Sequence, residues 1–588
     1  MPAEQELSLY DLLNYARPGE IQDLVDAIRK FETGEWSPDQ FKKFRLSRGT
    51  YGQRQPDVSM ERVKIPQGIL TADHLEVLGQ CAEKYSRGFG HVTTRQNIQF
   101  HFCKLADIPA LQYRLAEVGL TSREACGNTV RNVTACPYTG VAPGEAFDVT
   151  PYAQAVTRHF LRNPICQDLP RKFKIAFSCG HAGDCAQGAI NDIGLLARLE
   201  GDVPGFRMTI GGGLSTSPEN GHLLFDFLPG DELVPACEAV VRLFDRTGNR
   251  QNKARARLKY VIRKLGWEET RRLVLEELDK IRAQGGAKLA IDPRPAGQLA
   301  RPRLPVLSPS PAPASDPAFA RFLDTNVMAQ KQPGYHAVTV RLPRGDVTAA
   351  QFRALARLSR QHGDGTVRTT NQQNMLLRNV PQSSLFALWR ALGEAGLEKS
   401  GAATIVDVTS CPGADSCNLA VTTSRDLAST ITSALENANG HADAVAAAAD
   451  LDIKISGCPN SCGQHHVAAL GFHGTVRRVG GKAMPEYQLH LGGGITEQGG
   501  ATFGRQVVKI PAHRVAEAVL RLCELYLQER MGGERPRAFF QRVSEEAVKA
   551  KLADLTAVDE STVKPEEFQD LGMEDAFSVK IGAGECAA

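Results

Sequence analysis

The sequence of 588 residues predicts an α+β protein that is built from two copies of one unit. Two stretches, 64–101 and 341–378, share one pattern of apolar and polar positions, and "NVTACP" (132–137) and "DVTSCP" (407–412) follow them at nearly the same offset. A proline-rich stretch, RPRLPVLSPSPAPASDP (301–317), separates the copies as a linker, because proline interrupts helices and central strands. Motifs that recur in one order over such a length indicate duplication.

Each copy has the same expected order of elements. In the first copy a short strand precedes an amphipathic helix in LTADHLEVLGQCAEKY (70–85), an alternating strand in VTTRQNIQFHF (92–102) and a second helix. This order is typical of helices packed on a sheet. We expect the two copies to form a pseudo-twofold pair with a ligand between them.

Composition and charge exclude several classes of protein. No apolar run approaches the roughly 18 residues that a membrane-spanning helix needs. The first twenty residues, MPAEQELSLYDLLNYARPGE, lack the apolar centre of a signal peptide, so we expect a cytoplasmic protein without a membrane partner. The net charge of +3 gives no indication of nucleic acid. Fourteen cysteines in such a chain favour metal or redox roles over disulfides.

Four cysteines of the second copy have a spacing that fits a metal centre. Cys411 and Cys417 form a C-x5-C pair, and Cys458 and Cys462 form a C-x3-C pair about 40 residues later. Four thiolates can hold a cubane iron–sulfur cluster or a tetrahedral zinc ion. Structural zinc usually takes C-x2-C pairs, so the spacing favours a cluster and leaves zinc or buried thiols as alternatives. The pair 465–466, two histidines, is expected to pack or to bond to backbone.

The segments "TSCPGADSCNLA" and "SGCPNSCGQHH", together with the duplication, resemble the assimilatory sulfite and nitrite reductases over roughly residues 45–530. The resemblance implies two cofactors, siroheme and a [4Fe–4S] cluster held by all four cysteines, with Cys462 also bridging to the siroheme iron. It also implies a fold: two ferredoxin-like half-domains and two siroheme- and cluster-binding α+β domains, related by pseudo-twofold symmetry.

The resemblance, together with the proline-rich linker, divides the chain into seven expected segments. We expect an N-terminal helical extension (1–45), a first ferredoxin-like half-domain (46–125), a first siroheme-binding domain (126–290), a proline-rich linker (291–320), a second ferredoxin-like half-domain (321–400), a cluster and siroheme domain (401–530) and a C-terminal extension (531–588).

Four cations match positions that surround the substrate in this family: Arg62, Arg131, Lys172 and Lys174. Six-electron reduction of an oxyanion needs charge neutralisation and a supply of protons, which cations near the substrate can provide. Along a strand, the two lysines of K-x-K would point to the same face. The alternative for each residue is an ordinary solvent-exposed cation.

Siroheme carries eight carboxylates, so its pocket is expected to be basic and rich in hydrogen-bond donors. The family uses the segment "TTRQNIQFH" for this cofactor, and alternate residues of one strand, Arg95, Asn97, Gln99 and His101, would share a face. The second copy reads TTNQQNMLL and lacks the Arg, the second Gln and the His. Asn460, between two cluster cysteines, is expected to contact the macrocycle.

The resemblance also bears on substrate and electron donor. K-x-K is typical of the sulfite branch and K-x-N of the nitrite branch. We therefore expect reduction of sulfite to sulfide, with nitrite to ammonia as the alternative and a non-catalytic, metal-stabilised binding protein as a remote one. Tyr51 and Cys126 match positions that a thioether joins in some ferredoxin-dependent members; a packed tyrosine and a buried thiol are the alternative. No dinucleotide-binding glycine motif is recognisable. Electrons are thus expected from a ferredoxin, or alternatively from a flavoprotein subunit.

Three cysteines of the first copy have no place in this scheme. Cys136 occupies the repeat position of Cys411, and we expect it not to be a ligand. Cys179 and Cys185, with His181 between them, are expected to be packed thiols, with a second metal site as the alternative. The basic stretch RQNKARARLKYVIRK (250–264) is interpreted as an amphipathic helix with a solvated face, and otherwise as a surface for the electron donor.

Overall fold

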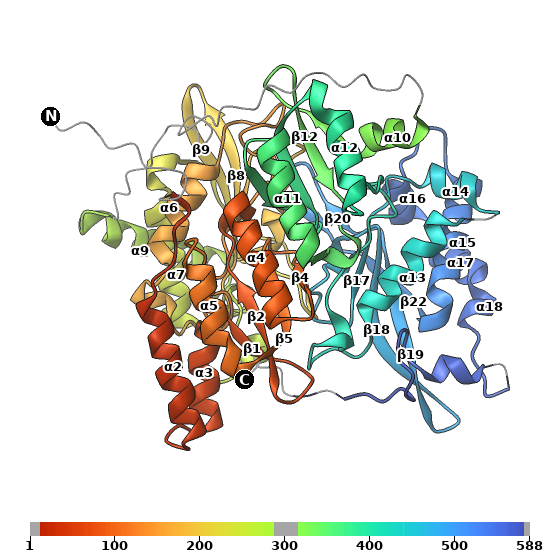
Figure 1. Cartoon of the computed structure of the whole chain (residues 1–588), viewed down its shortest axis with the longest axis horizontal. Coiled ribbons are helices and arrows are strands. Elements are labelled where there is room, and N and C mark those ends of the chain that lie inside the picture. The colour runs from red at the N-terminus through yellow and green to blue at the C-terminus, as the bar shows by residue number, and fades with distance from the viewer. Residues whose placement is uncertain (1–11, 287–315, 439, 562, 581, 583–588) are drawn as a thin grey trace.

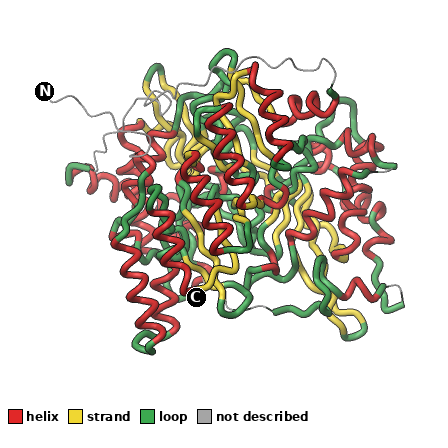
Figure 2. Tube along the Cα trace, in the orientation of Figure 1, coloured by secondary structure: helices red, strands yellow, loops and turns green. Residues whose placement is uncertain are grey.

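The computed structural model describes residues 12–286, 316–438, 440–561, 563–580 and 582. The two halves of the chain lie side by side, the N-terminal half in red to yellow and the C-terminal half in green to blue (Figure 1). Strands occupy the interior and helices flank them (Figure 2). Of the described helices, none combines the length and the apolar character that a membrane crossing would need.

Two sheets exchange a strand. One runs β1 (Thr50–Gly52), β2 (Val58–Val63), β5 (Ile98–Lys104), β4 (Phe89–Val92) and then β13 (Asp346–Thr348), which belongs to the other half of the chain. The second sheet has the equivalent strand order and takes its last strand, β3, from the first half of the chain. Its strands are, in order, β11 (Val327–Ala329), β12 (Tyr335–Val340), β15 (Met375–Pro381), β14 (Thr366–Thr369) and β3 (Ile69–Thr71). Each half therefore completes the sheet of the other.

The exchanged strands run directly into equivalent helices. Thr71 ends β3 and caps α4 (Ala72–Tyr85), and Thr348 ends β13 and caps α11 (Ala349–His362); each hydroxyl accepts the third backbone N–H of its helix. The two helices pack against each other at the front of the molecule (Figure 1). One hydrophobic core joins residues of both halves. At roughly 1.5–3 kcal/mol for each large apolar side chain buried, this shared core strongly favours the paired arrangement. The second helices of the two units, α5 (Ile108–Ala116) and α12 (Leu385–Glu394), flank the same core.

The other two sheets are also copies of each other. One is ordered β6 (Thr134–Ala135), β7 (Ile175–Ser178), β8 (Ile193–Glu200), β9 (Val203–Ile210) and β10 (His222–Pro229). The other is ordered β16 (Thr409–Ser410), β17 (Ile453–Ser456), β18 (Leu470–Val479), β19 (Lys482–Leu491) and β22 (Arg505–Pro511). In both, the first three strands are parallel and the rest antiparallel. The helices on these sheets are α6 (Thr150–Phe160), α7 (Leu233–Thr247), α8 (Leu258–Leu265), α9 (Trp267–Ala283), α13 (Ser424–Glu436), α14 (Ala442–Ala447) and α15 (Val515–Glu529).

The segment VTTRQNIQFHF is not one strand, and this prediction is wrong. β4 ends at Val92, β5 begins at Ile98, and a tight turn lies between them, closed by a hydrogen bond from Thr93 N–H to Asn97 O (2.9 Å). Gln96 has a positive φ of 61° there, a left-handed conformation that is typical of turns. Arg95 and Asn97 therefore lie on a turn, and only Gln99 and His101 lie on β5.

The ends of the chain add short helices around the duplicated units. Two precede the first sheet, α2 (Gly19–Glu32) and α3 (Pro38–Ser47), and three follow the last one, α16 (Pro536–Arg542), α17 (Glu545–Lys551) and α18 (Ala553–Thr556). Most of the predicted linker, 291–315, lies outside the described residues. Its last part is helical instead: α10 (Pro317–Asn326) starts there, because Asp316 caps the helix and proline suits the first helical position.

Candidate active site

The four predicted cluster cysteines lie on two loops at one edge of a sheet. Cys411 follows β16, with Cys417 six residues on, and Cys458 and Cys462 lie in the loop after β17. Because β16 and β17 are parallel neighbours, the loops that leave their carboxyl ends meet. The thiols lie close enough that Cys462 acts electrostatically on each of the other three. The structure thus brings the four cysteines together, and none of them forms a disulfide.

The surroundings of these thiols fit an iron–sulfur cluster. Cys411 Sγ accepts a hydrogen bond from Gly457 N–H (3.3 Å), and Cys458 Sγ accepts one from Asn460 Nδ2 (3.5 Å), as thiolate ligands commonly do. Burial first, and then Cys462 and Cys411, raise the pKa of Cys417 to about 12. Four thiolates crowded in this way need a compensating positive charge, which a cluster of iron ions supplies.

A group of cations lies together in the first half of the chain. Burial first, and then Arg257, Arg95 and Lys172, lower the pKa of Lys174 well below its ordinary value. Burial, followed by Arg131, lowers the pKa of Arg95 to about 9. Lys172 and Lys174 lie in the extended chain just before β7, on either side of a buried phenylalanine at 173.

Asp192 is the carboxylate that faces these cations. It is fully buried and accepts hydrogen bonds from Arg257 Nε (3.1 Å) and Nη2 (2.7 Å), while its second oxygen also accepts Lys174 N–H (2.8 Å). The negative charge of Asp192 thus balances the positive charge of Arg257. Arg95, Arg131 and Lys174 contribute charge beyond that balance, so the group is net positive and suits an anionic ligand.

Arg62 and Arg131 are held together by one carbonyl. Arg62 Nη1 donates to Ala125 O (3.2 Å) and Arg131 Nε donates to the same oxygen (3.1 Å). When its amide oxygen is turned toward Arg62, the Gln99 side chain accepts a hydrogen bond from Arg62 Nε (3.0 Å). Because Arg131 is also an electrostatic neighbour of Arg95, the predicted substrate cations form one continuous group.

The turn after β4 connects the cations with the cysteine loop. Thr94 Oγ1 donates to Cys462 O (3.1 Å), and the next residue, Arg95, donates to Asn191 Oδ1 (2.6 Å) and to Asn132 O (2.7 Å). Nearby, the Ser215 hydroxyl donates to Asn460 Oδ1 (3.3 Å). Of the predicted cofactor residues of the first half, Arg95 therefore lies beside the predicted cluster loop of the second half.

Buried polar atoms at this junction fit a ligand with many hydrogen-bonding groups. Arg95 Nε, Asn132 Oδ1 and Gln464 Oε1 are buried without a hydrogen-bond partner among the described residues. A buried unsatisfied polar atom costs roughly 1–3 kcal/mol, so such atoms indicate a ligand or water. A macrocycle with carboxylates and polar edges, such as siroheme, fits this donor set.

Two predicted cofactor residues have other surroundings than expected. Asn97 Oδ1 accepts Ile65 N–H (3.2 Å), a contact that supports the turn. Both ring nitrogens of His101 are buried without a partner among the described residues, and burial first, then the His91 ring, lower the pKa of His101 well below its ordinary value. His101 is therefore neutral and lies beside another imidazole, and Arg425 and Arg62 also act on it electrostatically.

Tyr51 and Cys126 lie together, as the thioether prediction requires. Both belong to a small apolar cluster with Leu46 and Met60, and Cys126 is fully buried. The covalent bond between them stays a prediction.

The sequence patterns did not identify several residues that belong to this region. Arg257 and Lys259 are buried, so the interpretation of 250–264 as a helix with a solvated basic face is wrong for these two cations. Lys259 Nζ donates to Leu214 O (2.8 Å), which holds the loop next to Ser215. Their signal was weak, because two buried cations among four exposed ones and one half-buried one leave the amphipathic pattern intact.

The C-terminal extension supports a cysteine loop, which no sequence pattern indicated. Asp570 Oδ2 accepts Thr423 N–H (2.8 Å), and the Thr423 hydroxyl donates to Leu571 O (2.8 Å). Thr423 follows Cys417 in the same loop. The segment after α18 thereby fixes the loop from outside.

The two histidines at 465–466 belong to a larger group. His466 Nε2 bonds to Ser215 O (2.8 Å), as expected for a residue that bonds to backbone. His465 packs on the rings of His473 and His490, with centroids 4.9 and 4.8 Å away. Burial first, and then the neighbouring rings, lower the pKa of His465 well below its ordinary value, so the ring is neutral.

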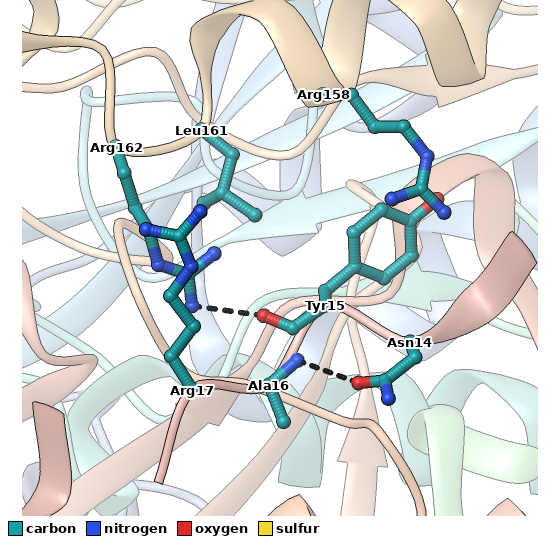
Figure 3. A pocket seen from close by; sticks show the side chains of 7 residues that line it. All are labelled: Asn14, Tyr15, Ala16, Arg17, Arg158, Leu161 and Arg162. Carbon is teal, nitrogen blue, oxygen red and sulfur yellow. Dashed lines mark hydrogen bonds between the residues drawn. The ribbon is translucent and has the colours of Figure 1, made fainter. Parts of the chain in front are cut away.

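A pocket of about 250 Å³ lies away from this site. It is lined by the segment 14–17 and by Arg158, Leu161 and Arg162 at the end of α6 (Figure 3). None of the predicted substrate, cofactor or cluster residues lines it, so it does not form part of the candidate active site.

Comparison with known proteins identifies the family. A model described as the nitrite and sulphite reductase 4Fe-4S domain matches residues 126–282 and 401–558. A second, the nitrite/sulfite reductase ferredoxin-like half domain, matches residues 51–118 and 328–395. The chain belongs to the nitrite and sulfite reductase family. The predicted family, fold class and cofactors, siroheme and a [4Fe–4S] cluster, are thereby confirmed.

Individual relatives divide between two substrates. A protein named sulfite reductase (ferredoxin) 1, of Mycolicibacterium paratuberculosis, is 29% identical over 83% of each chain. A chloroplastic ferredoxin–nitrite reductase of Oryza sativa subsp. japonica is 30% identical over 81% of this chain and 75% of its own. The solved structure of Mycobacterium tuberculosis NirA protein superposes with a TM-score of 0.76 at 25% identity, covering 92% of this chain and 98% of that one. The chain is thus a sulfite or nitrite reductase.

Proposed function

We propose that this protein reduces sulfite to sulfide with six electrons that a ferredoxin delivers. One observation carries the choice of sulfite: Lys174, the second lysine of K-x-K, lies within the cation group beside Arg95 and Arg257. Sulfite carries up to two negative charges near neutral pH and nitrite carries one. A site with an additional cation therefore stabilises sulfite more than nitrite.

The residues divide into two roles in this proposal. Arg62 and Arg131 hold the oxyanion, because guanidinium groups bind oxyanions in a bidentate way. Lys172 and Lys174 supply protons to the oxygens that leave as water, and a lowered pKa brings the Lys174 amine closer to the working pH of a general acid. When bound, the siroheme and the cluster supply the iron for the oxyanion and the path for the electrons.

Other residues would hold the cofactors. Cys411, Cys417, Cys458 and Cys462 would bind the cluster, and Arg95 would bind carboxylates of the siroheme. Asn460 bonds to Cys458 Sγ and to Ser215, which places it between the cluster loop and the first half. It would therefore limit how the two cofactors approach each other.

Ferredoxin is the proposed donor because relatives over most of the chain are named for it, on both the sulfite and the nitrite branch. The position of Tyr51 beside Cys126 supports a thioether, as in some ferredoxin-dependent members. Peptide mass spectrometry would detect this bond as a loss of two hydrogens in a joined Tyr51–Cys126 peptide.

Steady-state kcat/KM for sulfite and nitrite, measured side by side on cofactor-loaded protein with reduced ferredoxin, tests the substrate. A clear preference for sulfite is expected. A preference for nitrite would contradict the argument from Lys174 and would favour the nitrite branch, to which relatives of 30–31% identity also belong.

A further inference from the structure

Three cysteines of the first half form a second cluster of thiols. The Sγ atoms of Cys136, Cys179 and Cys185 all lie within 4.8 Å of one another, and those of Cys179 and Cys185 are 3.9 Å apart. Cys136 and Cys179 are fully buried and Cys185 is half-buried. The sequence had suggested that Cys136 is not a ligand and that the other two merely pack, but all three converge on one point.

The trio occupies the pseudo-twofold equivalent of the iron–sulfur site. Cys136 follows β6 and donates its N–H to Phe177 O of β7 (2.9 Å), just as Cys411 follows β16 and donates to Ile455 O of β17 (3.2 Å). The loop after β7 carries the other two thiols, as the loop after β17 does for its pair.

The second loops correspond in detail. Cys185 stands two residues before Gln187, and Cys462 two residues before Gln464; both glutamines have a positive φ, 60° and 67°, and each begins a short 3-10 turn. The turn after β4 contacts Cys462, and the matching Asn371 Nδ2 in the second half donates to Ala186 O, next to Cys185 (3.3 Å).

The spacing of the sulfur atoms distinguishes the possible uses of the trio. A disulfide needs a separation of about 2.05 Å, so the described thiols are not bonded to one another. In a cubane, each thiolate binds a different iron, and the sulfur atoms stand farther apart. A tetrahedral ion with metal–sulfur bonds of about 2.3 Å puts its thiolates about 3.8 Å apart, close to the observed 3.9 Å.

Hydrogen bonds favour the thiolate form at one of the three positions, Cys185, whereas burial first, and then the neighbouring thiols, raise the pKa of Cys136 well above its ordinary value. The backbone N–H of His181 donates to Cys179 Sγ, and that of Cys179 donates to Cys185 Sγ. Burial alone would raise the pKa of Cys185, but the bonds from the Cys136 and Cys179 thiols and from the Cys179 amide lower it well below its ordinary value.

A buried cation lies near the trio. Arg368, from the sheet of the other half, is an electrostatic neighbour of Cys136, and its Nε and Nη1 are buried without a partner among the described residues. Arg378, Asp148 and Asp364 act on Arg368 more strongly than Cys136 does, so Arg368 is one of several charges around the trio. Glu145, held by Lys331, is an electrostatic neighbour of Cys179.

We propose that Cys136, Cys179 and Cys185 bind one zinc ion, at the site that duplication left opposite the iron–sulfur cluster. No further Cys, His, Asp or Glu ligand atom of the described chain lies within the same 4.8 Å, so water fills the fourth position. Binding displaces the thiol protons into solvent and involves no electron transfer. The ion would tie the loop 179–185 to β6.

Metal analysis of the holoenzyme tests this inference, which does not depend on whether sulfite or nitrite is the substrate. We expect about one zinc per chain in addition to iron. Cys185→Ser should lose the zinc and retain the iron content and the siroheme absorption of the parent protein. Cys237→Ser, a buried thiol of α7 in the same domain, is the matched control and should retain the zinc.

A second measurement covers the case in which Cys185→Ser fails to fold. Parent holoenzyme stripped of zinc by a chelator and then titrated with Zn²⁺ should take up about one ion and release protons. Failure to take up zinc would overturn the proposal, as would a Cys179–Cys185 disulfide in untreated protein. Loss of iron instead of zinc from Cys185→Ser would assign the trio to iron and would equally overturn it.

Discussion

Replacement of Lys174 by Asn tests the basis for choosing sulfite. The change removes one cation from a group that also contains Arg95 and Arg257 and puts a neutral amide in its place. A hydrogen bond from a charged donor contributes roughly 1.5–3 kcal/mol, which corresponds to about 10- to 100-fold in kcat/KM. Sulfite should lose about this much. Nitrite carries one negative charge and keeps a partner in the amide, so its kcat/KM should fall about tenfold less than that of sulfite. The sulfite-to-nitrite ratio should therefore fall about tenfold.

The same variant should change the pH dependence. Because burial and neighbouring cations lower the pKa of Lys174, the free site loses the lysine proton at a pH below the ordinary lysine range. An incoming anion favours the protonated amine, so binding takes up a proton and KM for sulfite should rise as the pH rises above the lowered pKa. Lys174→Asn should lose this rise.

The assay is steady-state turnover with reduced ferredoxin, with siroheme and iron contents matched between proteins. Lys264→Asn, an exposed lysine at the end of α8, is the control and should leave both substrates unaffected. An unchanged sulfite-to-nitrite ratio in Lys174→Asn would refute the reasoning, because the additional cation would then not distinguish the two anions.

Three further outcomes follow from the surroundings of other residues. Cys411→Ser should abolish the cluster, seen as loss of cluster iron and of activity; retention of the full iron content would contradict the ligand set. Arg257→Met leaves Asp192 buried beside a single backbone donor and should destabilise the protein by about 3–5 kcal/mol, measured as a lower thermal midpoint, whereas an unchanged midpoint would show that the pair is dispensable. Burial raises the pKa of Glu61 to about 7, so the folded state binds an additional proton and the free energy of unfolding should fall by about 3 kcal/mol from pH 4.5 to 7. Glu61→Gln should remove this pH dependence, and a parent protein that lacks the pH dependence would refute the assignment.

The parts of the fold that sequence could predict depend on local order. The repeat, the helices after Thr71 and Thr348, and the four cysteines are all visible as motifs with fixed spacing. Two parallel strands that end in cysteine loops bring those loops together whatever the rest of the chain does. The exchange of β3 and β13 between sheets was not predictable, because a three-residue strand pairs equally well with either sheet until the shared core selects one.

Some parts of the site could not be predicted because they depend on long-range contacts or on single dihedral angles. The alternation of polar and apolar residues in 92–102 is the same for a strand and for a strand interrupted by a turn, and the turn is visible only in the Thr93–Asn97 hydrogen bond and the positive φ of Gln96 between them. The pairing of Arg257 with Asp192 joins residues 65 apart in the sequence. Cys136 and Cys179 likewise meet only because β6 and β7 are neighbours.

Comparison of the two copies within this chain separates structural from ligand-binding residues. Gln96 and Gln373 both have a positive φ, and their Oε1 atoms accept Ala135 N–H (3.0 Å) and Ser410 N–H (2.9 Å) at matching places. Asn97 is matched in the same way by the asparagine at 374, so these residues hold the turn in both halves.

The positions that differ between the copies are those that face the junction of the two halves. Where the first copy has Arg95, Gln99 and His101, the second has Gln, Leu and Arg at 372, 376 and 378. A duplicated fold can tolerate these changes, because the hydrogen bonds that close the turn involve none of the three. Cysteines show the same division: one copy has the set for a cluster, and the other has three thiols at the spacing of a single ion. The two copies thus keep the same supporting turns but differ at one pair of equivalent sites. This difference accounts for one cofactor site and one proposed zinc site in the same chain.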